Sequence, residues 1–257
     1  MNIIINSNQK IQGSSPCDAM YNIDSSCLED GCKYKVNWKF TKSFLTDFQS
    51  LLLSKPPWAQ YTADNIGVNI LTDITGNNRH ATMSNVSKAS FNGNGSSVSI
   101  NYLYGSPTST ILFPTGSVGT NFKLASLTRY ETVGIKTRIL TSTGNWLHGH
   151  WNGFSGCCYY NVSWLTPNNV VNNNWCNMIG NNTLAAPNNF IYNKNSNGIA
   201  SGGNGDRVFS INISDFPLEK SDFQFAQLII WNISLSYAEE LIVTNAIDRY
   251  LLCGQLL

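Results

Sequence analysis

The segment from Asn145 to Tyr160 gathers the residue types best suited to binding chemistry. If its Trp-Leu-His-Gly-His-Trp run is extended, successive side chains alternate, so Trp146, His148 and His150 share one face. An indole can stack on the apolar face of a sugar, while polar groups such as Asn152 bind its hydroxyls. These four residues form the predicted ligand-binding set. The alternative is that Trp146 and Trp151 belong to the sandwich core and that the histidines are hydrogen-bonded edge residues.

The sequence lacks some of the residues that metal binding or glycan hydrolysis would require. The His148-x-His150 spacing suits a metal because both rings point the same way, but His80 is the only other histidine in the chain. A retaining glycan hydrolase needs two carboxylates about 5 Å apart, which on a strand means acidic residues at i, i+2 or i+4. No Glu-x-Asp run occurs, and Glu239 and Glu240, two of the five glutamates, fall near the C-terminus in a stretch with helical pattern. We therefore expect that the chain is not an enzyme.

The cysteines leave two interpretations open. There are seven, so at least one has no partner if all pairing is internal. Adjacent Cys157 and Cys158 point to opposite faces of a strand, and one of them can pair with Cys176 across a sheet. A second bridge is open to the three N-terminal cysteines, Cys17, Cys27 and Cys32. The alternative is that these cysteines are buried thiols.

The composition excludes some partners. Lys and Arg number 16 against 15 Asp and Glu, for a formal charge of +1, so nucleic acid is not an expected partner. Charged residues are only 12% of the chain, and Asn, Ser, Thr and Gly must supply the polar surface. Asn and Gly tolerate turn conformations, which suits a loop-rich all-β protein. An AT-rich genome, whose codons favour Asn, is the alternative explanation.

The sequence shows no export or membrane signal. The start, MNIIINSNQK, lacks a basic region followed by 7–15 apolar residues, so we expect no signal peptide. No segment approaches the ~20 apolar residues of a membrane span. Asn-x-Ser/Thr sequons would be surface acceptor sites in a secreted protein, although chance also produces them in an Asn-rich chain. The candidate glycosylation sites are Asn85, Asn94, Asn161, Asn181, Asn212 and Asn232.

The pattern of the chain changes near residue 58. In TKSFLTDFQSLLL the apolar residues fall at helical spacing up to Pro56 and Pro57, so residues 1–58 are predicted to be a partly helical N-terminal extension or docking arm. Residues 59–257 contain short apolar or alternating runs separated by Gly, Asn, Pro and Ser, as in many antiparallel strands. Near the end, Ser236 and Glu239 form a capping box that predicts a closing helix up to Gly254.

Two stretches then carry a resemblance to a known family. LTDITGNNRHATMSN, residues 71–85, resembles the D-x-x-G-N-x-x-H/N-A-T segment of concanavalin-like, laminin-G-like jelly rolls, and FAQLIIWNISLSYAEE, residues 225–240, resembles their closing segment. The stretch 138–166 is similar to a subgroup from large-DNA-virus and marine algal or bacterial proteins. The resemblance spans residues 59–257. It implies an all-β, two-sheet antiparallel jelly-roll sandwich with a C-terminal helix.

The resemblance also implies ligands and partners. Many relatives hold calcium through Asp and Asn oxygens, and an Asx-rich turn is the alternative use of such residues. The candidate calcium ligands are Asp73, Asn77, Asn78 and Asp206. The expected function is a lectin-like module for glycan recognition or attachment at a virion or cell surface. The alternatives are a capsid-associated or fibre component that assembles with other capsid or surface proteins through residues 1–58, and a glycan hydrolase of the same fold.

Overall fold

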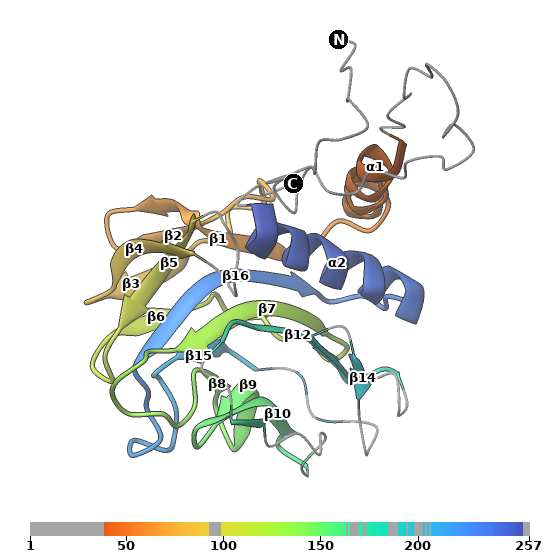
Figure 1. The fold of residues 1–257 in the computed structure, drawn as a ribbon. Helices are drawn as coiled ribbons and strands as arrows, with labels where there is room; N and C mark the ends of the chain where they lie inside the picture. The colour runs from red at the N-terminus through yellow and green to blue at the C-terminus, as the bar shows by residue number, and fades with distance from the viewer. Residues whose placement is uncertain are drawn as a thin grey trace.

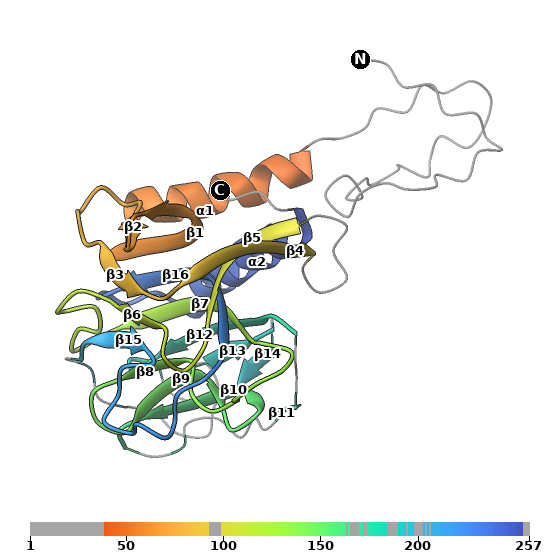
Figure 2. The same ribbon diagram turned by 90° about the vertical axis from the view of Figure 1, so that its left-hand side faces the viewer.

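The computed structural model describes residues 39–92, 99–162, 164, 170–171, 174–184, 190–193, 195–197, 203, 205 and 207–253. Within this part the chain forms two helices and sixteen strands, and the paired strands are antiparallel (Figure 1). The strands form two packed layers, with both helices on the outside of one layer (Figures 1 and 2). The predicted all-β sandwich with a C-terminal helix is confirmed.

One layer, called here the helix-covered sheet, follows the order β14-β13-β12-β7-β16-β1. Strand β5 also pairs with β16, and β4 pairs with β5. The bounds of its strands are β1 (Ala59–Gly67), β4 (Ser87–Asn92), β5 (Ser99–Gly105), β7 (Lys123–Tyr130), β12 (Cys176–Asn181), β13 (Phe190–Tyr192), β14 (Asn195–Asn197) and β16 (Phe223–Trp231).

The other layer, called here the open sheet, follows the order β11-β10-β9-β8-β15-β6-β3-β2. Because β2 pairs with β1, hydrogen bonding continues from one sheet into the other. The bounds of its strands are β2 (Ile70–Asp73), β3 (Ala81–Ser84), β6 (Thr110–Leu112), β8 (Leu140–Ser142), β9 (Trp146–Trp151), β10 (Phe154–Tyr160), β11 (Val170–Val171) and β15 (Phe209–Ile211).

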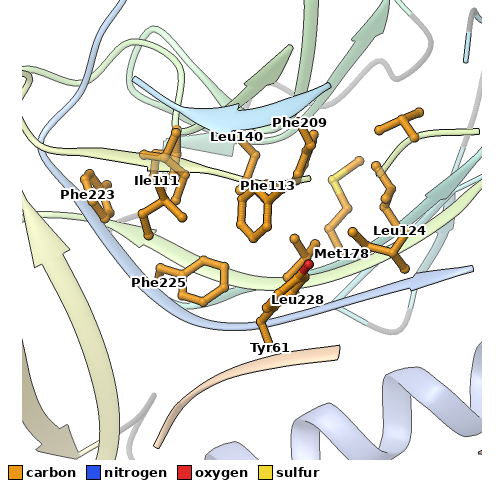
Figure 3. Packing of buried hydrophobic residues seen from close by; sticks show 14 of the residues in the cluster. Tyr61, Ile111, Phe113, Leu124, Leu140, Met178, Phe209, Phe223, Phe225 and Leu228 are labelled. Atoms are coloured by element: carbon orange, nitrogen blue, oxygen red, sulfur yellow. The ribbon is translucent and has the colours of Figure 1, made fainter. Parts of the chain in front are cut away.

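The main core lies between the two sheets. Tyr61 and Phe225 project from the helix-covered sheet toward Phe113 and Phe209 on the opposite side (Figure 3). The ring of Phe113 lies 5.0 Å from that of Tyr61 and 5.4 Å from that of Phe209, centroid to centroid. Each fully buried side chain of this size contributes roughly 1.5–3 kcal/mol through removal of apolar surface from water. This core therefore holds the sandwich together.

A second core joins the helix-covered sheet to the helices. Strand β16 is buried along its whole length because Leu228 and Ile230 face the open sheet while Ile229 and Trp231 face the helices. Helix α2 (Tyr237–Cys253) covers this outward face. Its start has the predicted capping box, since the Ser236 backbone N–H donates to Glu239 Oε2 at 2.6 Å and the Glu239 N–H donates to Ser236 Oγ at 3.3 Å.

The predicted N-terminal helix is also present. Helix α1 (Lys39–Ser54) ends just before Pro56, and it packs on the second core through Phe48 and Leu51. Lys55 Nζ lies 2.8 Å from Glu239 Oε2, which ties the end of α1 to the start of α2. The domain boundary at residue 58 stays a prediction, and residues 1–38 lie outside the described part of the chain.

Helix α2 carries one polar stripe into the second core. The Glu240 and Lys123 side chains are fully buried, with Oε1 and Nζ 3.8 Å apart, and Asn181 Nδ2 donates to the same Oε1 at 3.1 Å. Two turns further along α2, Asp248 Oδ1 accepts from Asn177 Nδ2 at 2.8 Å. Residues four and eight apart on a helix share a face, so this stripe fixes how α2 lies on β7 and β12.

Asparagine occupies the left-handed backbone positions of this fold. Among the described residues, every non-glycine with positive φ is an Asn. At the turn between β9 and β10, Asn152 (φ 48°) and Gly153 (φ 84°) form the two-residue connection that hairpins favour. The seven positions are Asn69, Asn78, Asn85, Asn152, Asn161, Asn193 and Asn212. The turn explanation of the Asn-rich composition therefore holds at these positions.

Candidate functional site

The predicted ligand-binding residues do not share an exposed face. Trp146, His148 and His150 do lie on one side of β9, but that side faces the helix-covered sheet and all three side chains are fully buried. The ring of Trp146 stacks on that of Tyr160 with centroids 4.5 Å apart. Asn152 is exposed at the hairpin turn. The expected solvent-facing position of the three ring side chains is therefore wrong, and sugar binding by this set stays untested.

The two histidines are neutral core residues. His148 Nδ1 and the Tyr160 hydroxyl are 2.7 Å apart, and His150 Nδ1 lies 3.3 Å from Thr128 Oγ1. Burial lowers the pKa of both imidazoles to about 3, because the charged form would lose its hydration. The ring of His150 also packs edge-on against Tyr130 at 4.7 Å. The alternative interpretation is confirmed for Trp146, which is core, and for the hydrogen-bonded histidines. It is wrong for Trp151, which is half-buried, and for the edge position, because β9 lies between β8 and β10.

The candidate calcium residues build a corner of the fold. The Asp73 carboxylate accepts from the backbone N–H groups of Gln60, Thr75 and Arg79, each at 3.1 Å. Asn77 Nδ2 donates to the Trp58 carbonyl at 3.2 Å. These bonds tie the loop after β2 to β1.

Asn78 has a left-handed backbone in the same loop, and Asp206 lies outside the described residues. In the part of the chain that the structure describes, no group of three His, Cys, Asp or Glu side chains could hold a metal ion. Calcium binding stays a prediction.

Of the two interpretations of the central cysteines, the bridge with Cys176 is not formed and the buried-thiol alternative is confirmed. Cys157, Cys158 and Cys176 are buried thiols. Burial raises the pKa of Cys157 and of Cys176 to about 12, which keeps them protonated and unreactive. The other cysteines proposed for bridging, Cys17, Cys27 and Cys32, lie outside the described residues.

The sequons divide by exposure. Asn181 and Asn212 are buried, and Asn212 Nδ2 donates to the carbonyls of Ser106, Ser109 and Ser221 at 2.9–3.0 Å. The folded chain cannot present these two amides for glycosylation, so that prediction is corrected. Asn85 is exposed, Asn161 and Asn232 are half-buried, and Asn94 lies outside the described residues.

An exposed aromatic cluster lies on the opposite face of β9 and β10. It consists of Trp151, Tyr159 and Trp164, and we call it the tryptophan surface. The ring of Trp164 lies 5.1 Å from that of Trp151 and 5.5 Å from that of Tyr159, both in edge-on geometry. Trp164 is 40% exposed, and the other two are half-buried. The alternation of side chains along β9 predicts that Trp151 and Trp146 lie on opposite faces of the strand. It does not predict which of the two faces is exposed to water.

The comparisons with known proteins concern the fold. No protein-family model matches the sequence, and no curated protein matches it. A Trypanosoma rangeli sialidase in complex with 2,3-difluoro-KDN superposes with a TM-score of 0.53 and 11% identity, over 82% of this chain and 39% of the sialidase. The same enzyme with the inhibitor DANA gives a TM-score of 0.51 and 10% identity over the same shares. At such identities the similarity shows a shared fold, and this chain spans well under half of the sialidase.

A domain of similar size gives a lower score. Domain 4 of AbnA, a GH43 extracellular arabinanase from Geobacillus stearothermophilus in complex with arabinotriose, superposes with a TM-score of 0.46 and 13% identity. The match covers 72% of this chain and 96% of that domain.

The expectation that the chain is not an enzyme is corrected by the sialidase similarity. That expectation depended on the absence of closely spaced carboxylates. Sialidases are an exception to the two-carboxylate rule because their nucleophile is a tyrosine. Since two sialidase complexes superpose on this chain with TM-scores above 0.5, missing Glu-x-Asp runs no longer argue against glycan hydrolysis.

Proposed function

We propose that this chain is a glycan-interacting β-sandwich and that the tryptophan surface is its sugar contact. The observation that carries the proposal is the exposure of Trp164 beside Trp151 and Tyr159 on the outer face of the open sheet. Water-exposed indole costs free energy that a sugar's apolar C–H face recovers on stacking. Edge-on neighbours hold the Trp164 ring in place, so binding loses little side-chain entropy.

Polar groups for sugar hydroxyls lie next to the aromatic residues along the chain. Asn152 follows Trp151 directly and is exposed, and Asn161 closely follows Tyr159 and is half-buried. Both asparagines have a positive backbone φ, so the turns that contain them fix the position of their backbone. The fold similarity to a sialidase in complex with a nononic sugar acid adds support to the glycan class.

Binding isotherms on a glycan array and by calorimetry test the proposal. Trp164→Ala should lower the affinity for a bound glycan at least tenfold, whereas Trp164→Phe, which keeps a flat ring, should retain part of it. Leu218→Ala, at a 90%-exposed apolar side chain elsewhere, is the matched control and should change nothing. If the wild-type chain binds no glycan on the array, or if Trp164→Ala binds as well as the wild type, the proposal fails.

Glycan hydrolysis is the second candidate function, and the sialidase similarity favours it. Release of the fluorophore from a 4-methylumbelliferyl sialoside by the full chain would support it. Absence of turnover on sialosides and on a panel of neutral glycosides would leave glycan binding alone.

Attachment at a virion or cell surface and assembly through residues 1–58 are the finer parts of the proposal. Among the described residues, neither helix has the length and apolar character needed to cross a bilayer. Cross-linking of the chain to purified virion or cell-surface glycoproteins would support this placement, and deletion of residues 1–38 would test the assembly role.

A further inference from the structure

A second group of aromatic residues surrounds an arginine on the outward face of the helix-covered sheet. The guanidinium carbon of Arg129 lies 4.7 Å from the ring centroid of Phe91 and 5.1 Å from that of Trp175. Such contacts attract the cation to the ring faces and restrict its rotation. Arg129 is half-buried on β7, whereas the tryptophan surface lies on the far side of the sandwich. The two groups are therefore separate sites.

The orientation of Arg129 is fixed by hydrogen bonds. Its Nε donates to Gln224 Oε1 at 2.7 Å, and Gln224 Nε2 donates to Glu131 Oε2. Gln224 is buried and pairs with Arg129 directly across β16 and β7. The Gln224 amide thus donates to one Glu131 oxygen and accepts from Arg129 Nε. This second bond fixes the Nε side of the Arg129 guanidinium.

The Arg129 guanidinium forms no direct ion pair among the described residues. Burial lowers its pKa, whereas the Glu131 carboxylate, bonded to the same Gln224, attracts its charge and raises that pKa against the lowering by burial. The ion pairs within 4.0 Å in the described part of the chain involve Lys55, Lys123 and Arg138, and none involves Arg129. Among the described residues, its side chain donates to Gln224 through Nε, and its Nη1 and Nη2 groups donate to no backbone or side-chain atom. A half-buried cation with unused donors gains most from a ligand that brings a negative charge.

Tyrosines form the rim beside this guanidinium. Tyr104 pairs with Gln224 across β5 and β16 and is 37% exposed. The ring of Tyr102 lies 6.1 Å from that of Tyr104 and 5.8 Å from that of Trp175. Aromatic walls lower the local dielectric around a bound charge, and phenol groups can bond to hydroxyls.

We propose that Arg129 is an anion-recognition residue that binds the carboxylate of a small acidic ligand, with an acidic sugar as the class that fits the tyrosine rim. The two terminal N–H groups of a guanidinium match the two oxygens of a carboxylate in a bidentate pair. The site does not depend on the tryptophan surface, so it stands or falls separately from the function proposed above.

Calorimetric titration of the full chain with glucuronic acid and with glucose tests the site. Glucuronic acid should bind at least tenfold more tightly than glucose, and Arg129→Gln should abolish that difference. Arg129→Lys keeps the charge but loses the fork, so it should retain only part of the preference. Lys88→Gln removes an equal charge from exposed Lys88 on β4 and should have no effect. Trp164→Ala should also leave glucuronate affinity unchanged.

The outcomes separate the possible sources of the anion. Acetate binding that disappears in Arg129→Gln would support a carboxylate site without sugar selectivity. Inorganic phosphate binding as tightly as glucuronate would overturn the assignment to carboxylates. Equal affinity for glucose and glucuronic acid, or full glucuronate binding by an Arg129→Gln variant with wild-type thermal stability, would overturn the proposal.

Discussion

Replacing Lys123 with methionine should destabilise the fold strongly, because it leaves Glu240 buried without its counter-charge. The two charged atoms are 3.8 Å apart and both side chains are fully buried between β7 and α2. At an effective dielectric constant of about 20, two unit charges at that distance attract by about 4 kcal/mol. Removing one partner of a buried pair typically costs roughly 3–5 kcal/mol. We expect a loss in this range from Lys123→Met at pH 8.

A double variant distinguishes the free energy lost by leaving a buried charge unpaired from the free energy lost through altered packing. Lys123→Met with Glu240→Gln removes both charges, and the new amide can still accept from Asn181 Nδ2. Neutral replacement of a buried ion pair is often nearly neutral for stability. The double variant should therefore recover most of the free energy of unfolding that the single variant loses.

The pH dependence gives a second, signed test. Burial raises the pKa of Glu240 to about 8 and lowers the pKa of Lys123 to about 8, since each charged form loses hydration. A raised carboxyl pKa contributes stability at low pH that is lost as the pH rises from about 5 through 8. A lowered lysine pKa contributes stability at high pH that is lost as the pH falls from about 10 through 8. Lys123→Met should therefore lose stability with rising pH, and Glu240→Gln should lose it with falling pH.

Urea unfolding followed by tryptophan fluorescence measures these free energies. Titrations of the wild type, the two single variants and the double variant at pH 5, 7, 8 and 9 complete a double-mutant cycle. A loss below about 1 kcal/mol from Lys123→Met at pH 8 would refute the reasoning, because buried pairs cost more to break. So would two single variants whose stabilities change with pH in the same direction.

Three further predictions concern the cap, the thiols and one asparagine. Ser236→Ala removes the N-cap bond of α2 and should lower the free energy of unfolding by about 1 kcal/mol, whereas no change in thermal midpoint would contradict the cap. The buried thiols of Cys157, Cys158 and Cys176 should resist Ellman's reagent until the chain unfolds; rapid labelling of the native chain at these positions, located by peptide mapping, would be inconsistent with their burial. Asn212→Ala loses bonds to three backbone carbonyls at a positive φ and should cost about 2–4 kcal/mol in denaturant titration, and a loss under 0.5 kcal/mol would argue against this.

The sequence predicted those parts of the fold that local signals determine. The capping box at Ser236 and the prolines after Ser54 mark helix ends through bonds within a few residues. Strands were recognisable because Gly, Asn and Pro separate them. The order of pairing, in which β16 is central and β1 links the two sheets, depends on contacts between distant segments.

The candidate site could not be placed from alternation alone. Alternation correctly grouped Trp146 with His148 and His150, and Trp151 on the other side, but both faces of β9 carry an indole. Which face meets water depends on the sheet packed against it. No local sequence pattern predicted a site at Arg129, because its partners Phe91, Trp175 and Gln224 come from three distant parts of the chain.

The left-handed asparagines have a consequence for how this fold can change over evolutionary time. Loops normally diverge faster than strands, because a strand must keep its packing. In this chain the turn positions accept little besides Asn, Gly and Asp, since other side chains clash at positive φ. Buried aliphatic positions can exchange Leu, Ile, Val and Met with small losses. Distant relatives of this chain should therefore align best at their turns, with Asn and Gly in fixed spacing, and less well along the strands between them.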